Sequence, residues 1–271
     1  MNFTIALLQF NPTRKNVEKN IQKIQQAMEG IKADLIVFPE LSNSGYLYEK
    51  AEDLKPFSEE NDGHGPFLSA LIDLAKTING VVVTGYAEKE GLKLYNSAIA
   101  LSPQGPITNY RKTHLFDHEK MLFNPGDSGF KVFEWNSVKI GIMICFDWIF
   151  PEACRCLALQ GAQIIAHPAN LVLPYCQNAM VTRSIENRVF TITANRIGTE
   201  KLGDMRLSFT GTSQITDPSG AIRYRGPKDK ATVHIMAIEP NEAINKNLNP
   251  QNNLFKDRRP EMYKLVESRE H

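Results

Sequence analysis

The segment GIMICFDWIFPE, residues 141–152, places a cysteine where a strand gives way to a helix. The apolar run before Cys145 is typical of a buried strand. Pro151 and Glu152 fit the first turn of a helix, because proline lacks the N–H that would be unpaired there. A thiol beside a helix N-terminus is a good nucleophile, since the helix dipole favours the thiolate. The alternative is that Cys145 is a small buried apolar residue, as free cysteines commonly are.

Two more ionisable residues follow predicted strands. Glu40 comes directly after the apolar run at 35–38, where a carboxylate is costly to bury unless it is paired or functional. Lys112, in YRKTHLF at 110–116, follows the strand and turn that begin at Tyr95. Side chains that follow strands can converge at one edge of a sheet. A glutamate, a lysine and a cysteine could therefore meet, although each charge taken separately fits a solvated surface position as well.

The composition is that of a globular protein, with 42% hydrophobic and 23% charged residues among 271. The formal net charge of +1 argues against a protein that binds nucleic acid or an anionic membrane. No window approaches the roughly 18 apolar residues that a membrane helix needs, and the N-terminus does not read as a signal peptide. We therefore expect neither nucleic acid nor membrane as a partner.

The cysteines give an expectation about the redox environment. All four fall between residues 145 and 176, whereas a disulfide framework would spread them along the chain. This spacing favours free thiols and a cytoplasmic location.

Apolar runs and helical periodicity predict an α/β protein with mixed sheets that carry helices on their faces. Strands and helices alternate up to about residue 200, and strands dominate afterwards. The expected strands are 3–9, 35–38, 81–87, 95–101, 138–144, 163–167, 190–195 and 232–238, and the expected helices are 66–78, 151–160, 177–188 and one built on Val17, Ile21, Ile24 and Met28. Turns are expected at 103–105 and 218–220. No linker divides the chain, so we expect one domain over 1–271 with a polar C-terminal arm at about 245–271.

Three motifs, in this order, resemble the nitrilase superfamily of carbon–nitrogen hydrolases. They are P-E-L-x-x-x-G-Y with Glu40, Y-R-K-x-H-L-F with Lys112, and C-F-D-x-x-F-P-E with Cys145. The resemblance covers nearly the whole chain and is closest to a bacterial and archaeal amidase/nitrilase branch that also keeps H-P-A-N-L, here 167–171. It implies a four-layer α-β-β-α sandwich of two mixed sheets flanked by helices, an architecture that the pattern alone does not select.

The resemblance also implies the roles of individual residues. Glu40 would be the general base, Lys112 the stabiliser of the negative oxygen, and Cys145 the nucleophile. A second glutamate, Glu119 in HEKMLFNPGD, would orient substrate or Lys112, or relay protons. The backbone N–H of Phe146 would share the oxyanion with Lys112.

The substrate pocket implied by the resemblance involves Phe146, Trp148, Asn170 and Leu171. Packing beside the pocket is the alternative for Trp148, and capping of a turn is the alternative for Asn170. His114 and His118 are four residues apart, as in some zinc sites, but no third ligand has recognisable spacing. We therefore expect no metal and no cofactor.

The expected activity is hydrolysis of a small aliphatic or dicarboxylic monoamide through a Cys145 thioester, which releases ammonia and a carboxylic acid. A nitrilase or an N-carbamoyl amidohydrolase is the alternative, because those branches share the triad. A non-catalytic interaction protein is a remoter alternative, which loss of a triad residue would favour. The resemblance further implies a homodimer or higher oligomer, formed through the helices beside the nucleophile with C-terminal arms that reach across.

Overall fold

The computed structural model describes residues 2–263, so the last part of the predicted arm at about 245–271, residues 264–271, lies outside the described residues. Its first sheet has six strands in the order β14-β1-β2-β3-β4-β5. β1 pairs in parallel with β2 and antiparallel with β14, so the sheet is mixed. The strands span Phe3–Gln9 (β1), Leu35–Val37 (β2), Val81–Glu90 (β3), Lys93–Ser102 (β4), Gly105–Arg111 (β5) and Thr232–Ile238 (β14).

The second sheet also has six strands, in the order β13-β12-β9-β8-β7-β6, and is mixed as well. A separate two-stranded ribbon pairs β10 with β11. The strands span Val132–Trp135 (β6), Val138–Ile142 (β7), Ile164–Ala169 (β8), Phe190–Asn195 (β9), Thr199–Leu202 (β10), Met205–Ser208 (β11), Gln214–Thr216 (β12) and Ile222–Arg225 (β13).

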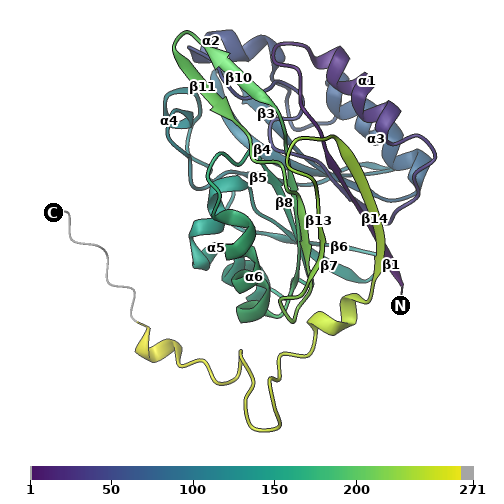
Figure 1. Ribbon diagram of the computed structural model, residues 1–271, viewed down its shortest axis with the longest axis vertical. Coiled ribbons are helices and arrows are strands. Elements are labelled where there is room, and N and C mark those ends of the chain that lie inside the picture. The colour runs from purple at the N-terminus through teal and green to yellow at the C-terminus, as the bar shows by residue number, and fades with distance from the viewer. Residues whose placement is uncertain (1, 264–271) are drawn as a thin grey trace, which may run out of the picture.

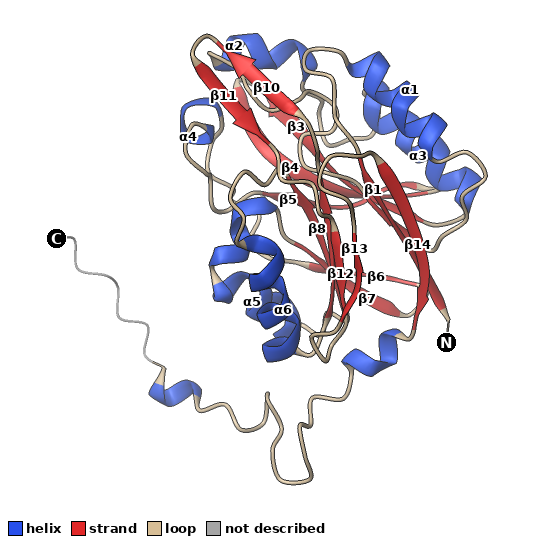
Figure 2. Ribbon diagram, viewed as in Figure 1, coloured by secondary structure: helices blue, strands red, loops and turns tan. Residues whose placement is uncertain are grey.

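Helices cover the outer faces of both sheets (Figure 1). Figure 2 shows α1 (Val17–Ala27) and α3 (Pro66–Ile78) together on one side, with α5 (Pro151–Leu159) and α6 (Cys176–Asn187) on the other. The remaining helical segments are short: α2 (Ala51–Leu54), α4 (Glu119–Leu122), and the 3₁₀ turns η1 (Lys55–Phe57), η2 (Cys145–Ile149), η3 (Pro240–Ala243) and η4 (Pro260–Met262).

The alternation of side chains along each strand explains the layers. In β1, Ile5 and Leu7 pack in a cluster that includes Ile140 and Ile164 of the second sheet. Their neighbours Ala6 and Leu8 pack in a different cluster, with residues of α1 and α3. The strand is therefore buried on both faces, and the two sheets pack face to face between helical layers, as the resemblance implies.

Long, strongly patterned elements were predicted well. β1, α3, β9 and β14 have the predicted bounds. β7 ends at Ile142 rather than at residue 144, because η2 begins at Cys145. β6, β10, β11 and β13 were missed, since four-residue strands are too short to show a period.

After η3 the chain extends beyond the sandwich (Figure 1) but stays in contact with it, because Lys246 Nζ donates to the Asn187 and Arg188 carbonyls at 2.9 Å and Phe255 packs against the core. An isolated bridge between Asn247 and Asn253 closes a loop in this segment, and η4 follows. Among the described residues, no helix has the length and apolar character that crossing a bilayer requires.

Candidate active site

Glu40 lies in the segment that follows β2, and this segment continues to form hydrogen bonds with the neighbouring strand β3. Phe38 N–H donates to Val83, and Gly85 N–H donates to the Pro39 carbonyl at 3.1 Å. The Glu40 backbone lies so close over Gly85 that a Cβ there would overlap the Glu40 Cα. A glycine at position 85 is therefore what lets the glutamate sit against the sheet.

Lys112 directly follows β5. Its N–H donates to the Asn96 carbonyl of β4 at 2.8 Å, and its own carbonyl accepts the Gly126 N–H at 3.0 Å. A Cβ on Gly126 would overlap the Arg111 carbonyl, so this returning loop also needs a glycine. The backbone of Lys112 is thus held from two sides.

Glu119 begins the short helix α4, and its carboxylate turns inward. Glu119 Oε1 accepts the Tyr46 hydroxyl at 2.7 Å, and Oε2 accepts the Phe116 N–H at 3.1 Å. The side chain is 2% exposed. Buried carboxylates in proteins are paired, and the partner of Glu119 is Lys112.

Lys112 bridges the two glutamates. Its Nζ lies 2.7 Å from Glu40 Oε1 and 2.8 Å from each oxygen of Glu119. The side chains of Lys112 and Glu40 are wholly buried. Asn96 Nδ2 donates to the same Glu40 oxygen, Oε1, at 2.7 Å. Within the described residues, Glu40 Oε2 has no hydrogen-bond partner although it is buried.

The pKa values in this cluster reflect burial and mutual charge. Burial alone would lower the pKa of Lys112, but the carboxylates of Glu119 and Glu40 raise it above its usual value, so the ammonium stays charged at neutral pH. Burial raises the pKa of Glu119, and the charge of Glu40 adds to this, against the attraction of Lys112. The two carboxylates therefore compete for one cation.

Cys145 is the first residue of η2, and its backbone has φ of +37°. Such a conformation is costly for a residue with a side chain and is common at functional sites. Asp147 braces the turn, because its Oδ2 accepts the Ile144 N–H and the Tyr110 hydroxyl, both at 2.8 Å. Asp147 Oδ1 lies 2.7 Å from His114 Nδ1.

The expectation that a helix dipole favours the Cys145 thiolate is wrong. Burial, reinforced by the charge of Glu40, raises the pKa of Cys145 well above its usual value. Lys112 and the Asn170 N–H lower this pKa by less. The physical reason is that η2 is a five-residue turn around a buried sulfur, not a long exposed helix end. The resting group is a thiol, so it needs a base.

Cys145 lines a small cavity of about 20 Å³, which has room for roughly one water. All four predicted substrate contacts line it: Phe146, Trp148, Asn170 and Leu171. Neither side-chain polar atom of Asn170 has a hydrogen-bond partner within the described residues, although Asn170 is 2% exposed. The alternative of a turn cap is therefore wrong, because Asn195 Oδ1 accepts the N–H that follows Asn170 instead.

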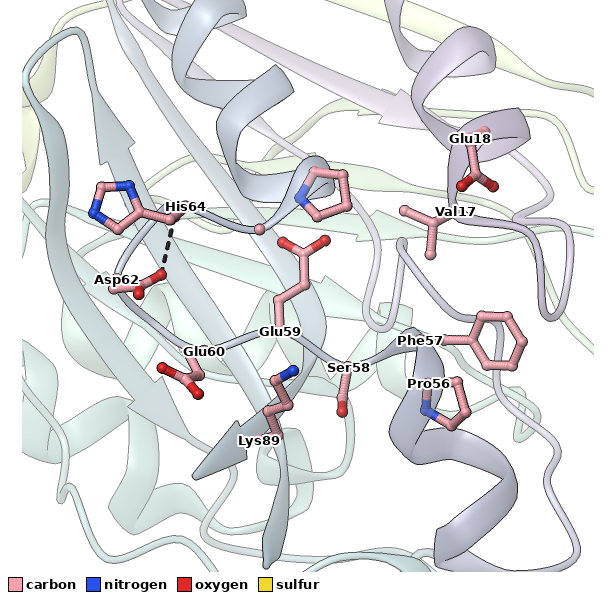
Figure 3. A pocket seen from close by; sticks show the side chains of 12 residues that line it. Val17, Glu18, Pro56, Phe57, Ser58, Glu59, Glu60, Asp62, His64 and Lys89 are labelled. Carbon is pink, nitrogen blue, oxygen red and sulfur yellow. Dashed lines mark hydrogen bonds between the residues drawn. The ribbon is translucent and has the colours of Figure 1, made fainter. Parts of the chain in front are cut away.

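A larger cavity, of about 380 Å³, lies elsewhere, between α1 and the start of α3 (Figure 3). None of the predicted site residues lines it. Its buried carboxylate, Glu59, accepts the N–H groups of Phe67 and Leu68 at 2.7 and 3.0 Å. That carboxylate caps the N-terminus of α3, a structural task. Asp62 Oδ1 accepts the His64 N–H at 2.9 Å.

His114 and His118 do not form a pair. His114 contacts Asp147, and His118 Nε2 lies 2.7 Å from the Tyr48 carbonyl. Across residues 2–263, no three histidine, cysteine or acidic side chains gather as metal ligands would. All four cysteines are free, as predicted.

Three residues that contact the predicted site were not singled out from the sequence: Asn96, Tyr46 and Asp147. Each lies inside or beside a motif or strand that was noticed, Tyr46 in G-Y, Asp147 in C-F-D, and Asn96 in the strand at 95–101. Polar residues within an otherwise apolar strand, such as Asn96, are the signal that could have found them.

The sequence pattern described as carbon-nitrogen hydrolase matches residues 4–245. A protein of Pyrococcus abyssi named nitrilase is 42% identical over 262 residues, which cover 96% of this chain and 98% of that protein. The chain belongs to the carbon–nitrogen hydrolase family. This carbon–nitrogen hydrolase is also 32% identical to N-carbamoylputrescine amidase of Arabidopsis thaliana, over 86% of this chain and 84% of that one.

The fold of this carbon–nitrogen hydrolase matches solved structures. The crystal structure of a carbon–nitrogen hydrolase from Helicobacter pylori superposes with a TM-score of 0.85 at 22% identity, over 97% of each chain. The predicted architecture and the resemblance to the nitrilase superfamily are therefore confirmed, and the protein is an enzyme that acts on carbon–nitrogen bonds.

Proposed function

We propose that this carbon–nitrogen hydrolase is a thiol-dependent amidase in which Cys145, Glu40, Lys112 and Glu119 carry the reaction. The observation that supports this most is that the two carboxylate oxygens of Glu40 have different surroundings. Its Oε1 is occupied by Lys112 and Asn96, whereas its buried Oε2 has no partner among the described residues. A buried oxygen without a partner is costly, and the transfer of a proton from a neighbouring thiol would give it a function.

In the first half of the reaction, Cys145 Sγ attacks the amide carbonyl carbon while its proton passes to Glu40 Oε2. The carbonyl π electrons move to oxygen, and that oxygen accepts hydrogen bonds from Lys112 Nζ and the Phe146 N–H. Glu40 then returns the proton to the amide nitrogen, the C–N bond breaks, and ammonia leaves. The product on the enzyme is a Cys145 thioester.

In the second half, Glu40 takes a proton from water as the water oxygen attacks the thioester carbonyl. The C–S bond breaks, the carboxylic acid departs, and Cys145 regains its proton from Glu40. The raised pKa of Cys145 suits this scheme, since proton transfer accompanies attack instead of preceding it. It also makes the sulfur a poor leaving group unless a proton is supplied, which gives Glu40 a task in both halves.

Glu119 is the positioning carboxylate in this proposal. It holds Lys112 Nζ together with Glu40, and it is itself fixed by the Tyr46 hydroxyl and the Phe116 N–H. An ammonium has three donors. One to Glu40 and one shared between the two Glu119 oxygens leave the third for the substrate oxygen.

The proposed substrate is a small aliphatic or dicarboxylic monoamide. The aromatic walls of the cavity beside Cys145, formed by Phe116, Phe146 and Trp148, support an apolar acyl chain. Asn170 supports a polar substrate end, because its free carboxamide offers one donor and one acceptor group. Nitriles and N-carbamoyl amines are the alternative substrates, as the names of the Pyrococcus and Arabidopsis relatives suggest.

A screen for ammonia release tests this proposal. Short monoamides, dicarboxylic monoamides, N-carbamoyl amines and nitriles are compared at equal concentration, with acid product measured in parallel. We expect a short monoamide to give the highest kcat/KM, with one ammonia per acid. Turnover confined to nitriles, or to carbamoyl compounds that release carbon dioxide with ammonia, would contradict the amidase proposal and favour the alternative.

We also propose that the enzyme forms a homodimer through α5 and α6. Ile149, Leu159 and Ile185 are 43–44% exposed around these helices, and Leu248 and Met262 of the C-terminal segment are exposed further. Apolar side chains of this size gain from being covered by a partner.

Light scattering should give a mass that is a multiple of 30.5 kDa. The double variant Leu159→Glu with Ile185→Glu should shift this mass toward that of the monomer. A wild-type mass of one chain at micromolar concentration would contradict the dimer.

A further inference from the structure

A buried histidine forms a hydrogen bond with the backbone of the proposed nucleophile. His167, in β8, is 0% exposed, and its Nε2 lies 3.0 Å from the carbonyl oxygen of Cys145. On its other side, Nδ1 lies 3.0 Å from Thr193 Oγ1 of β9, which is paired with His167 in the register of the two strands. The ring therefore connects two central strands of the second sheet to the backbone of the nucleophile.

The tautomer of His167 follows from its partners. A carbonyl oxygen can only accept, so Nε2 must carry the hydrogen that it donates to Cys145. Burial lowers the pKa of His167, so the ring is neutral and Nδ1 accepts the Thr193 hydroxyl. Both ring nitrogens are thus satisfied, and the ring orientation is fixed.

The carbonyl that His167 holds belongs to the same peptide unit as the Phe146 N–H. In a planar trans peptide, C=O and N–H point in opposite directions, so an anchor on the oxygen fixes the direction of the hydrogen. This peptide also follows a residue at φ of +37°, where the backbone is under strain. Without the anchor, rotation of the peptide plane would turn the N–H away from its target.

We propose that His167 is a positioning residue that keeps the Phe146 N–H aimed at the substrate oxygen by holding the Cys145 carbonyl. This rests on the proposed function, in which the Phe146 N–H is an oxyanion donor. His167 does not touch the substrate in this proposal. It transmits the rigidity of β8 and β9 to one backbone hydrogen.

Two nearly isosteric substitutions test the proposal. In His167→Gln the side-chain nitrogen can occupy the place of Nε2 and donate to the Cys145 carbonyl, whereas in His167→Asn it reaches only the place of Nδ1. Losing a whole oxyanion donor costs roughly 10²–10³ in kcat. A misdirected one should cost about 10- to 100-fold, so we expect this loss in kcat for His167→Asn with KM little changed. His167→Gln should stay within about fivefold of wild type.

The rate of Cys145 alkylation distinguishes a misdirected Phe146 N–H from a general disruption of the active site. Iodoacetamide forms a C–S bond with loss of iodide, and no carbonyl oxygen becomes negative in that step. With the exposed thiol removed by Cys156→Ser, the rate of Cys145 alkylation, mapped by mass spectrometry, should change less than about threefold in both His167 variants. Thermal unfolding shows whether each variant is folded.

Equal kcat in His167→Asn and wild type would overturn the proposal. So would equal losses in the Asn and Gln variants, or amide turnover and alkylation that fall together. Cys145→Ala is assayed alongside. If it is inactive while His167→Asn is normal, only the role of His167 fails. If it retains turnover, the proposed function itself fails.

Discussion

Replacing Cys145 with alanine is expected to lower kcat for any substrate amide by roughly 10⁴-fold or more, because no other group can form the thioester. The fold should survive, since alanine fits the space of the thiol and the turn is held by Asp147. Steady-state ammonia release measures the effect, and thermal unfolding checks the fold. A buried thiol with a raised pKa is uncharged at neutral pH, so the alanine removes no charge from the site.

Cys156→Ala is the matched control. Cys156 lies on α5, eleven residues beyond Cys145, and its side chain is exposed. We expect wild-type kcat from this variant. A Cys145→Ala enzyme that retained more than about a hundredth of the wild-type rate would show that the thiol is not the nucleophile.

Replacing Lys112 with methionine is expected to lower kcat by roughly 10²–10³-fold through loss of oxyanion stabilisation. It should also destabilise the protein by about 3–5 kcal/mol, because two buried carboxylates lose their shared cation. The first effect is measured by ammonia release and the second by denaturant unfolding.

The pH dependence of this variant has a definite sign. Without the ammonium, burial and the charge of Glu40 raise the pKa of Glu119 in the folded state above that in the unfolded chain. A raised pKa in the folded state means that stability is present at low pH and is lost as the pH rises. Lys112→Met should therefore unfold at lower denaturant concentration at pH 8 than at pH 5.

The double variant Lys112→Met with Glu119→Gln separates charge balance from catalysis. Neutralising Glu119 removes the repulsion, so we expect part of the lost stability to return while kcat stays low. Recovery of kcat together with stability would show that the ammonium serves the fold alone. A near-normal kcat in Lys112→Met itself would lead to the same conclusion.

The sequence predicted the elements whose pattern is local. β1 and α3 could be placed to the residue because their apolar spacing is regular over seven and thirteen residues. Short edge strands such as β13 could not, since four residues are too few to show a period, even though β13 pairs with β12 close by in the chain. The face-to-face packing of the sheets likewise came from the resemblance, because alternation within a strand does not say what covers each face.

The sequence identified which residues form the site, but it could not predict how their side chains are arranged. Glu40, Lys112 and Glu119 were singled out by motif, and the structure brings their side chains into contact. Which oxygen of Glu40 remains free depends on Asn96, a residue from another strand whose role no local pattern indicates. The raised pKa of Cys145 could not be predicted either, because burial is a property of the assembled sheets.

The acylation of Cys145 by substrate is the step on which the account depends. An activated ester, such as a p-nitrophenyl ester of the same acyl group, makes thioester formation faster than its hydrolysis, so that the intermediate accumulates. Rapid acid quench followed by peptide mass mapping should find the acyl group on the peptide that contains Cys145, at close to one per active enzyme. That group should disappear at the rate at which acid forms. The contrary result would be a burst of p-nitrophenol with the acyl group on another residue, or with Cys145 unmodified. Either finding would contradict the proposal that Cys145 is the nucleophile.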